Sequence, residues 1–327
     1  MNYSIIMTTE LLQKERHTAI DIMKGILIIS VIVGHMTEMP NGLHSLIYSF
    51  HMPAFFILAG CFFKIDSVRN VVVKSFRRLL LPYVFVCGVL LLYTGAVFAV
   101  TKSFHTGVIY AFAYPVAIHE ETPTLVIWFL AALFFARICY DIIWGARFHV
   151  ILKWIVAISI SALPLLISKY LDMPLAFLQG MSAVIFIALG KPFLNVVRSK
   201  YWYLLMPTLG GGILLLIPLY SIDMATIAYV NWPIAVVGAM SATCVLYYIA
   251  RGFEYIPIFS RMLIWFGKYS LVVMCAHTIE RFITIWSAVG LYDVYALLIA
   301  KILFCTLFTI VMSNVRLGRE IFLIKKG

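Results

Sequence analysis

Apolar runs of about twenty residues follow one another along almost the whole chain, with only short polar or charged breaks between them. Of the 327 residues, 63% are hydrophobic and 12% are charged, a composition far too apolar for a water-soluble domain. A bilayer core about 30 Å thick is crossed by roughly 20 apolar residues in a helix, because lipid offers no partner for unpaired backbone groups. The sequence therefore predicts an all-α polytopic membrane helix bundle, with residues 1–327 forming a single integral-membrane domain.

Ten transmembrane helices are predicted from the positions of the apolar runs. They start near residues 19, 44, 80, 124, 151, 174, 201, 232, 263 and 292. If the N-terminus is cytoplasmic, 21 of the 25 lysines and arginines fall on the inner side, as the positive-inside rule requires. An even number of spans then places the C-terminus in the cytoplasm as well. The net charge of +11 follows from this asymmetry, so it requires no nucleic-acid partner.

The first predicted span contains three ionisable residues, Asp21, Lys24 and His35, in the stretch DIMKGILIISVIVGH. Lys24 and His35 are eleven residues apart, so on a helix they differ in direction by only about 20° and are separated by roughly 16 Å of rise. Asp21 precedes Lys24 by three residues and can pair with it, which makes a buried ammonium tolerable. The three residues are therefore predicted to form one polar stripe, running from the inner surface toward the outer half of the membrane.

Two further histidines are predicted at about the same depth as His35. His51 lies about two turns inside the outer edge of the second span, and His277 lies in the outer part of the ninth, on the same helix face as Ser270. Such a group has three interpretations: structural histidines bonded to neighbouring helices, a metal site, or an acid–base site. The histidines lack the HxxxH spacing of a metal site, so no metal is expected, and acid–base chemistry fits the widest range of geometries.

The connection between the second and third spans is unusually basic. The stretch KIDSVRNVVVKSFRRLLLP carries five positive charges and one aspartate within 15 residues, on the predicted inner side. This density exceeds what topology needs and indicates a cytoplasmic anion as a ligand.

Five stretches, in order from residue 21 to residue 277, resemble the signatures of the acyltransferase-3 family of integral-membrane acyltransferases. They are DIMKGILIISVIVGH, FHMPAFFILAG, KSFRRLLLP, IWFLAALF and FGKYSLVVMCAH. The chain is most similar to the branch known as fucose 4-O-acetylase-like. It departs from the family in having Lys74 where the basic motif usually begins with arginine, and Ala59 where relatives often have serine.

The resemblance implies an O-acyltransferase in the cytoplasmic membrane of a bacterium. Such an enzyme takes an acetyl or other short acyl group from acyl-CoA, a co-substrate rather than a permanently bound cofactor. It places that group on a hydroxyl of a cell-surface glycan or of the glycan's lipid-linked precursor. The family's first-helix pair carries over to Lys24 and His35, and its acyl-CoA motif carries over to Lys74 and Arg77, with Arg78 beside them.

Within that chemistry, His35 is expected to be the general base or an acyl carrier, supported by Lys24 and Asp21. The acceptor is expected to contact residues from several spans: His51, Trp128, Ser270 and His277. The main alternative is a proton-coupled transporter or flippase of a glycan precursor, in which the stripe relays protons. A purely structural membrane protein is the third possibility. The transporter hypothesis does not account for the basic inner loop or for the five ordered family signatures.

Overall fold

The computed structural model describes residues 2–36, 40–101, 107–116, 125–199, 201, 203, 221–283, 286, 290 and 293–324. Its helices in the first half are α1 (Asn2–Gly34), α2 (Asn41–Tyr48), α3 (His51–Cys61), α4 (Val68–Ser75), the π-helical turn η1 (Phe76–Leu80), α5 (Leu81–Thr101), α6 (Gly107–Ala113), α7 (Trp128–Gly145) and α8 (Val150–Ala162). The remaining helices are α9 (Pro164–Ile167), the 3-10 turn η2 (Pro174–Ala176), α10 (Phe177–Ser182), α11 (Val184–Arg198), α13 (Trp232–Phe253), α14 (Pro257–Lys268), α15 (Ser270–Ile283), α17 (Val294–Asn314) and α18 (Arg316–Phe322).

Among the described residues, six helices are long and apolar enough to cross a membrane, or eight if each of two bent pairs counts as one span. Each contains or begins near one of the predicted starts. The first predicted span is the second half of α1, and the seventh falls mainly on residues 204–220, which lie outside the described residues. The predicted class, an all-α polytopic membrane bundle, is confirmed.

The two bent pairs differ from the continuous spans that the apolar runs predict. Residues 174–182 and 184–198 meet at 47°, and residues 257–268 and 270–283 meet at 77°. In the second pair, α14 ends because Tyr269 leaves helical geometry, with φ −101° and ψ 14°. The ninth predicted span is therefore two helices, and the bend turns α15 toward the C-terminal end of α1.

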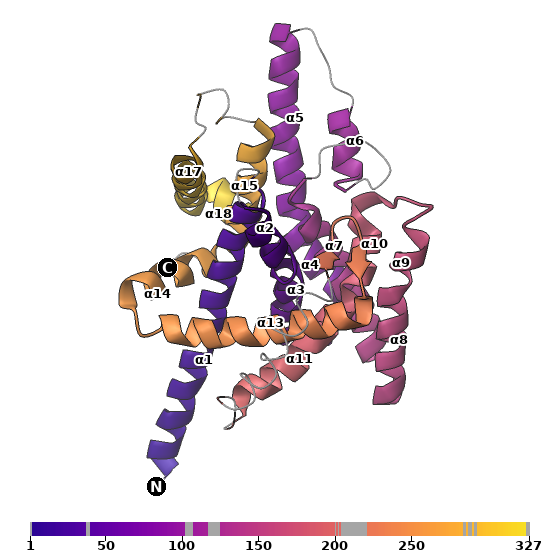
Figure 1. The fold of residues 1–327 in the computed structure, drawn as a ribbon, viewed down its shortest axis with the longest axis vertical. Helices are drawn as coiled ribbons and strands as arrows, with labels where there is room; N and C mark the ends of the chain where they lie inside the picture. The colour runs from indigo at the N-terminus through magenta and orange to yellow at the C-terminus, as the bar shows by residue number, and fades with distance from the viewer. Residues whose placement is uncertain are drawn as a thin grey trace.

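Helix α1 runs through the centre of the molecule and is crossed by α13, with α15 and α17 to one side and α7, α8 and α10 to the other (Figure 1). Two close helix crossings fix this arrangement. A Cβ atom on Gly25 would overlap the carbonyl oxygen of Leu263 in α14, and one on Gly60 of α3 would overlap the carbonyl oxygen of Ile187 in α11. Glycine at these positions lets the helix backbones touch.

The α3–α11 crossing gives a prediction about stability. Gly60→Ala places a methyl group against the α11 backbone, and overpacking of this kind costs about 1–3 kcal/mol. We expect a lower melting temperature for the purified variant in detergent. The control is Gly88→Ala in α5, where an added Cβ meets no atom within 4 Å. Equal melting temperatures for the two variants would show that the α3–α11 contact is not tight in solution.

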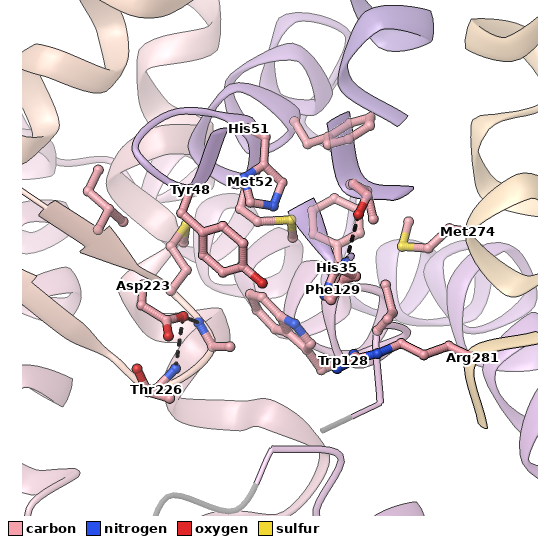
Figure 2. Close-up of a pocket in the computed structure, with 16 residues that line it drawn as sticks. His35, Tyr48, His51, Met52, Trp128, Phe129, Asp223, Thr226, Met274 and Arg281 are labelled. Carbon is pink, nitrogen blue, oxygen red and sulfur yellow. Dashed lines mark hydrogen bonds between the residues drawn. The ribbon is translucent and has the colours of Figure 1, made fainter. Parts of the chain in front are cut away.

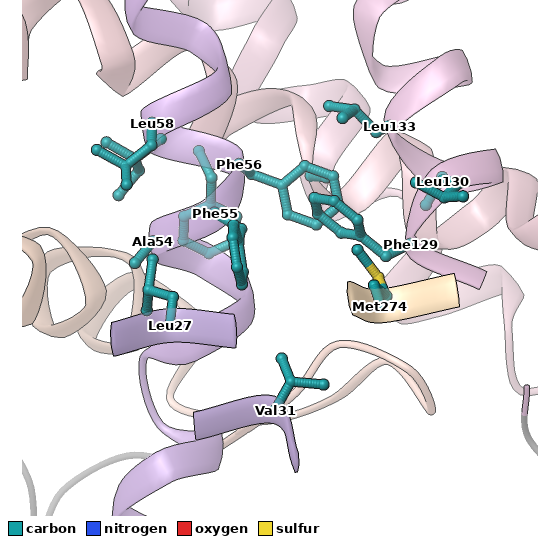
Figure 3. Packing of buried hydrophobic residues seen from close by; sticks show 14 of the residues in the cluster. Leu27, Val31, Ala54, Phe55, Phe56, Leu58, Phe129, Leu130, Leu133 and Met274 are labelled. Atoms are coloured by element: carbon teal, nitrogen blue, oxygen red, sulfur yellow. The ribbon is translucent and has the colours of Figure 1, made fainter. Parts of the chain in front are cut away.

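Aromatic and aliphatic side chains from α1, α3 and α7 form the core beneath the site described below (Figure 3). The Phe129 ring packs against Phe55 and Phe56, with centroids 5.7 Å and 4.7 Å apart, and Leu27 and Val31 of α1 lie close by. Tilted aromatic pairs at this spacing contribute more than their buried area alone. The core therefore holds the ends of three helices in fixed positions.

A short antiparallel hairpin precedes α13. Strand β1 (Ser221–Asp223) pairs with β2 (Ala228–Val230), and Ile222 lies opposite Tyr229. The hairpin is attached to α10, because the Gln179 side-chain amide donates to the Ala225 carbonyl at 2.9 Å and Tyr229 contacts Ser182. This hairpin was not predicted from the sequence, and it matters because its turn enters the site.

Candidate active site

A pocket lies where the C-terminal end of α1, helices α2 and α3, the N-terminal end of α7, the hairpin turn and α15 meet (Figure 2). Its polar and charged side chains are His35, Tyr48, His51, Asp223, Thr226 and Arg281. The rest of its wall is apolar or aromatic and is formed by Val31, Met52, Phe55, Val126, Trp128, Phe129, Ile222, Met224, Ala225 and Met274. An apolar wall with a few convergent polar groups is typical of a small-molecule site.

His35 directly follows the last residue of α1. Its Nδ1 lies 2.7 Å from the carbonyl oxygen of Val31, one turn earlier. Because a carbonyl oxygen can only accept, Nδ1 carries the ring proton and donates it, and Nε2 keeps a lone pair. In this form an imidazole is able to take a proton from a hydroxyl group.

His51, the first residue of α3, has the same arrangement. It is 3% exposed, and its Nδ1 donates to the Ile47 carbonyl oxygen at 2.7 Å. The Tyr48 ring contacts both histidines, with its centroid 6.2 Å from that of His35 and 5.1 Å from that of His51. The pocket therefore contains two imidazoles whose Nε2 atoms carry the lone pair, because Nδ1 of each ring donates to a backbone carbonyl of the preceding turn.

The remaining predicted acceptor residues have different positions. Trp128, the first residue of α7, lines the pocket, as expected. His277 is fully buried in α15 and lies behind His35, with ring centroids 5.4 Å apart, rather than in the pocket wall. Ser270 begins α15 and is not among the residues that line the pocket. The structure thus brings His35, His51, His277 and Trp128 together, but not Ser270.

Arg281 and Asp223 line the pocket although sequence reasoning did not select them. They enter from opposite sides, Arg281 from α15 and Asp223 from the end of β1 (Figure 2). One carboxylate oxygen of Asp223 accepts hydrogen bonds from the backbone N–H groups of Ala225 and Thr226, which fixes the turn. A signal for Arg281 was present in the sequence: it is one of only four basic residues that the predicted topology leaves away from the inner side.

Lys24 lies near the opposite end of the polar stripe from His35. Its Nζ is 3.3 Å from an Asp21 carboxylate oxygen, so the predicted pair is confirmed, and the two side chains are 29% and 26% exposed. The ammonium also lies above the Phe62 ring, 5.5 Å from its centroid, just beyond the end of α3. Lys24 does not line the pocket. One helix therefore carries His35 at one end of the stripe and an ion pair about 16 Å away at the other.

The predicted acyl-CoA residues lie on exposed surface around α4 and η1. Hydrogen bonds from Lys74, Asn70 and the backbone of Ser67 lower the pKa of Asp66 to about 2, so its carboxylate is ionised at any physiological pH. Lys74 pairs with that carboxylate at 2.6 Å. Arg77 and Arg78, in η1, are exposed, and no ion pair joins them to another described residue. They are the cations of this loop best suited to bind a phosphate.

A second group of cations surrounds the end of α3, close to Lys24. Arg137 of α7 is buried, pairs with Asp141 at 2.7 Å, stacks over the Phe63 ring and donates to the Lys64 carbonyl oxygen. Lys191 of α11 donates to the Cys61 carbonyl oxygen at 3.0 Å. These residues looked like ordinary inner-side charges in the sequence. Only the packing of α3 against α7 and α11 reveals that they converge.

Metal binding was one interpretation of the histidine group. Among the residues that the structure describes, no three His, Cys, Asp or Glu side chains form a group that could hold a metal ion. Carbonyl oxygens occupy Nδ1 of two of the histidines, and a carboxylate occupies Nδ1 of the third. This arrangement suits proton transfer at Nε2.

Residues 17–319 of the chain match the family model described as an acyltransferase domain, that of the acyltransferase-3 family. The match includes the whole pocket, the Asp21–Lys24 pair and the basic loop. No curated protein and no solved structure matches the chain.

Proposed function

Since the chain belongs to the acyltransferase-3 family and is a membrane acyltransferase, we propose that it moves an acetyl or other short acyl group from acyl-CoA to a hydroxyl of a cell-surface glycan or its lipid-linked precursor. The observation that carries this proposal is the unprotonated Nε2 of His35 at the wall of an aromatic-lined pocket. A transporter would need protonatable groups as well, but the family match favours an acyl-transfer reaction over transport.

In the proposed reaction, His35 Nε2 takes the proton of the acceptor hydroxyl as its oxygen attacks the thioester carbonyl carbon. The carbon–sulfur bond breaks, and the thiolate of CoA leaves and takes the proton back from His35. In a covalent variant, His35 Nε2 attacks the thioester first and carries the acyl group to the acceptor. Both routes use the same nitrogen, which the Val31 hydrogen bond leaves free.

The acceptor half of the pocket suits a sugar. Trp128 and Tyr48 offer aromatic faces for stacking on a sugar ring, and His51 and Asp223 offer acceptors for its hydroxyl groups. The carboxylate oxygen of Asp223 that does not bind the turn is available for such a hydrogen bond. Most pocket-lining positions lie in the outer parts of the predicted spans or in the outer connections between them, which supports approach of the acceptor from that side.

The donor is proposed to bind from the cytoplasm. Arg77 and Arg78 would hold the phosphates of CoA, with Lys74 beside them, while the pantetheine arm extends along α1 past Lys24. Lys191, near Lys24, adds positive potential along that path, whereas the charge of Arg137 is offset by Asp141. No permanently bound cofactor takes part in this scheme.

Purified protein in detergent tests the proposal. Acetyl-CoA is supplied with and without polyprenyl-linked saccharides or oligosaccharides, and free CoA thiol is measured over time. Thiol release that depends on the acceptor supports direct transfer, whereas one thiol per enzyme released without acceptor supports the acyl-histidine variant. If no saccharide yields an acylated product and the reconstituted protein instead moves saccharide across vesicles, the chain is a transporter.

The basic loop gives a second prediction. Replacing Arg77 and Arg78 together by glutamine should raise the KM for acyl-CoA about tenfold or more, because each charged hydrogen bond contributes about 1.5–3 kcal/mol. The KM for the acceptor should stay unchanged, and the difference should shrink at high salt. The matched control removes two exposed inner-side charges elsewhere, Arg147→Gln with Arg261→Gln. An equal rise in the KM for acyl-CoA in the control would show that Arg77 and Arg78 contribute to membrane topology and not to acyl-CoA binding.

A further inference from the structure

Three side chains donate to one buried carboxylate behind the pocket. Glu280 of α15 is fully buried, and its carboxylate accepts from His277 Nδ1 at 2.7 Å and from Lys301 Nζ of α17 at 3.0 and 3.1 Å. The Trp286 indole N–H also donates to it. A carboxylate with this many donors is held firmly in its ionised form.

His277 is oriented by this carboxylate. Because Glu280 accepts at Nδ1, the proton of the neutral ring lies there, and Nε2 carries the lone pair. His277 is 0% exposed, and its Nε2 has no hydrogen-bond partner in the described part of the chain. A buried nitrogen without a partner is rare and calls for an explanation. The His277 ring packs beside the ring of His35, which lines the pocket, with centroids 5.4 Å apart and planes at 56°.

We propose that His277 is a positioning residue that acts through His35: its ring, held by the buried Glu280 carboxylate, packs beside the His35 ring and stabilises the imidazolium that forms when His35 takes the proton of the acceptor hydroxyl. The inference rests on the proposed acyl transfer. The proton passes from the acceptor oxygen to His35 Nε2 as the thioester is attacked, and then from His35 Nε2 to the leaving thiolate of CoA. No electrons are exchanged, and no other reactant is needed.

The charges of the group fit this role. Glu280 and Lys301 form an ion pair, and the negative end of that pair is the one bonded to His277. When His35 acquires a proton, the Glu280 carboxylate is therefore already in place on the neighbouring ring and offsets part of the new positive charge. A preorganised buried carboxylate of this kind stabilises an imidazolium without having to reorient during the reaction. Arg281, next to Glu280 in sequence, faces the pocket and opposes the added charge, which makes the carboxylate more necessary.

The alternative is that Glu280 and Lys301 only hold α15 against α17. Two variants separate the alternatives. Glu280→Gln combined with Lys301→Met removes both charges together, and a buried ion pair replaced as a unit by neutral side chains is often tolerated. The glutamine oxygen still accepts from His277 Nδ1, so the orientation of the ring stays while the charge is lost. His277→Gln leaves the Glu280–Lys301 pair intact, because its amide N–H can donate to Glu280, but it removes the imidazole that packs against His35.

The experiment measures kcat, both KM values and the melting temperature for these two variants, for Glu280→Asp and for a control. The control is Thr278→Val, a buried neighbour whose hydroxyl donates to the Met274 carbonyl of its own helix. We expect kcat to fall about 100-fold in both variants, since general acid–base groups contribute about 10²–10⁴-fold, with both KM values within twofold of wild type. Glu280→Asp keeps the carboxylate and should recover part of the rate.

Wild-type kcat, within threefold, in His277→Gln would overturn the inference, whatever happens to the double variant. Wild-type kcat in a folded Glu280→Gln, Lys301→Met variant would show that the Glu280–Lys301 ion pair only stabilises the fold. Loss of kcat in Thr278→Val equal to that in the other variants would also overturn it. Failure of the proposed function is distinguishable, because it would leave the wild-type protein itself without acyl transfer.

Discussion

Replacing His35 by alanine is expected to lower the rate of acyl transfer by about 10³-fold or more, because loss of a general base alone costs about 10²–10⁴-fold and the covalent route would be lost as well. His35→Gln should fail too, because an amide cannot take the proton. The dissociation constant for acyl-CoA should stay near the wild-type value, since the donor phosphates are held by the basic loop. Turnover and acyl-CoA binding are to be measured on the same detergent preparation.

A histidine outside the pocket provides the control for that result. His149 is exposed at the start of α8, and His149→Gln should keep wild-type turnover. If His35→Ala retains more than about a tenth of the wild-type rate, the base lies on another helix. His51 is then the first candidate, because its Nε2 is left free in the same way.

Replacing Lys24 by alanine is expected to reduce both the rate and the stability, whereas Lys24→Arg should keep much of each. The ammonium pairs with Asp21 at 3.3 Å, and both side chains are about a quarter exposed, so solvent screens the pair in part. We therefore expect a stability loss of only about 1 kcal/mol in Lys24→Ala, but a fall in rate of tenfold or more. Melting temperature and kcat measure the two effects.

Two further variants separate the charge of Lys24 from its structural role. Asp21→Asn combined with Lys24→Met leaves no unpaired charge, so it should recover the melting temperature but not the rate. Arg316→Ala breaks a fully exposed ion pair with Glu320 and should change neither quantity. Recovery of the rate in the neutral double variant would mean that the Asp21–Lys24 pair serves only to stabilise α1.

The features that follow from the periodicity of one helix could be predicted from the sequence. The Asp21–Lys24 pair needs only a spacing of three residues, and the structure confirms it. The gathering of His35, His51 and His277 followed from their depth in three spans. It is confirmed, because His35 and His51 line one pocket and the His277 ring centroid lies 5.4 Å from that of His35. The helical membrane class followed from apolar run lengths alone.

Features that depend on contacts between helices could not be predicted. Glu280 and Lys301 are 21 residues apart, and their pairing depends on how α15 packs against α17 after the 77° bend at residue 269. Helix α15 contains no proline from which this bend could have been predicted. Asp223 reaches the pocket only because a hairpin forms in a stretch that the sequence predicts to be an outer loop. His277 was expected to contact the acceptor, but it lies behind His35 and outside the pocket wall, where it can support His35 instead.

The measurement that tests the account most directly follows the fate of an acetyl label. Membranes from cells producing the wild-type protein or His35→Ala at equal levels are given acetyl-CoA with a radiolabelled acetyl group, and the glycan fraction is isolated and treated with mild base. The account predicts base-labile label in the glycan with the wild-type protein and almost none with His35→Ala. Equal label with both proteins, or saccharide transport without any label, would contradict it.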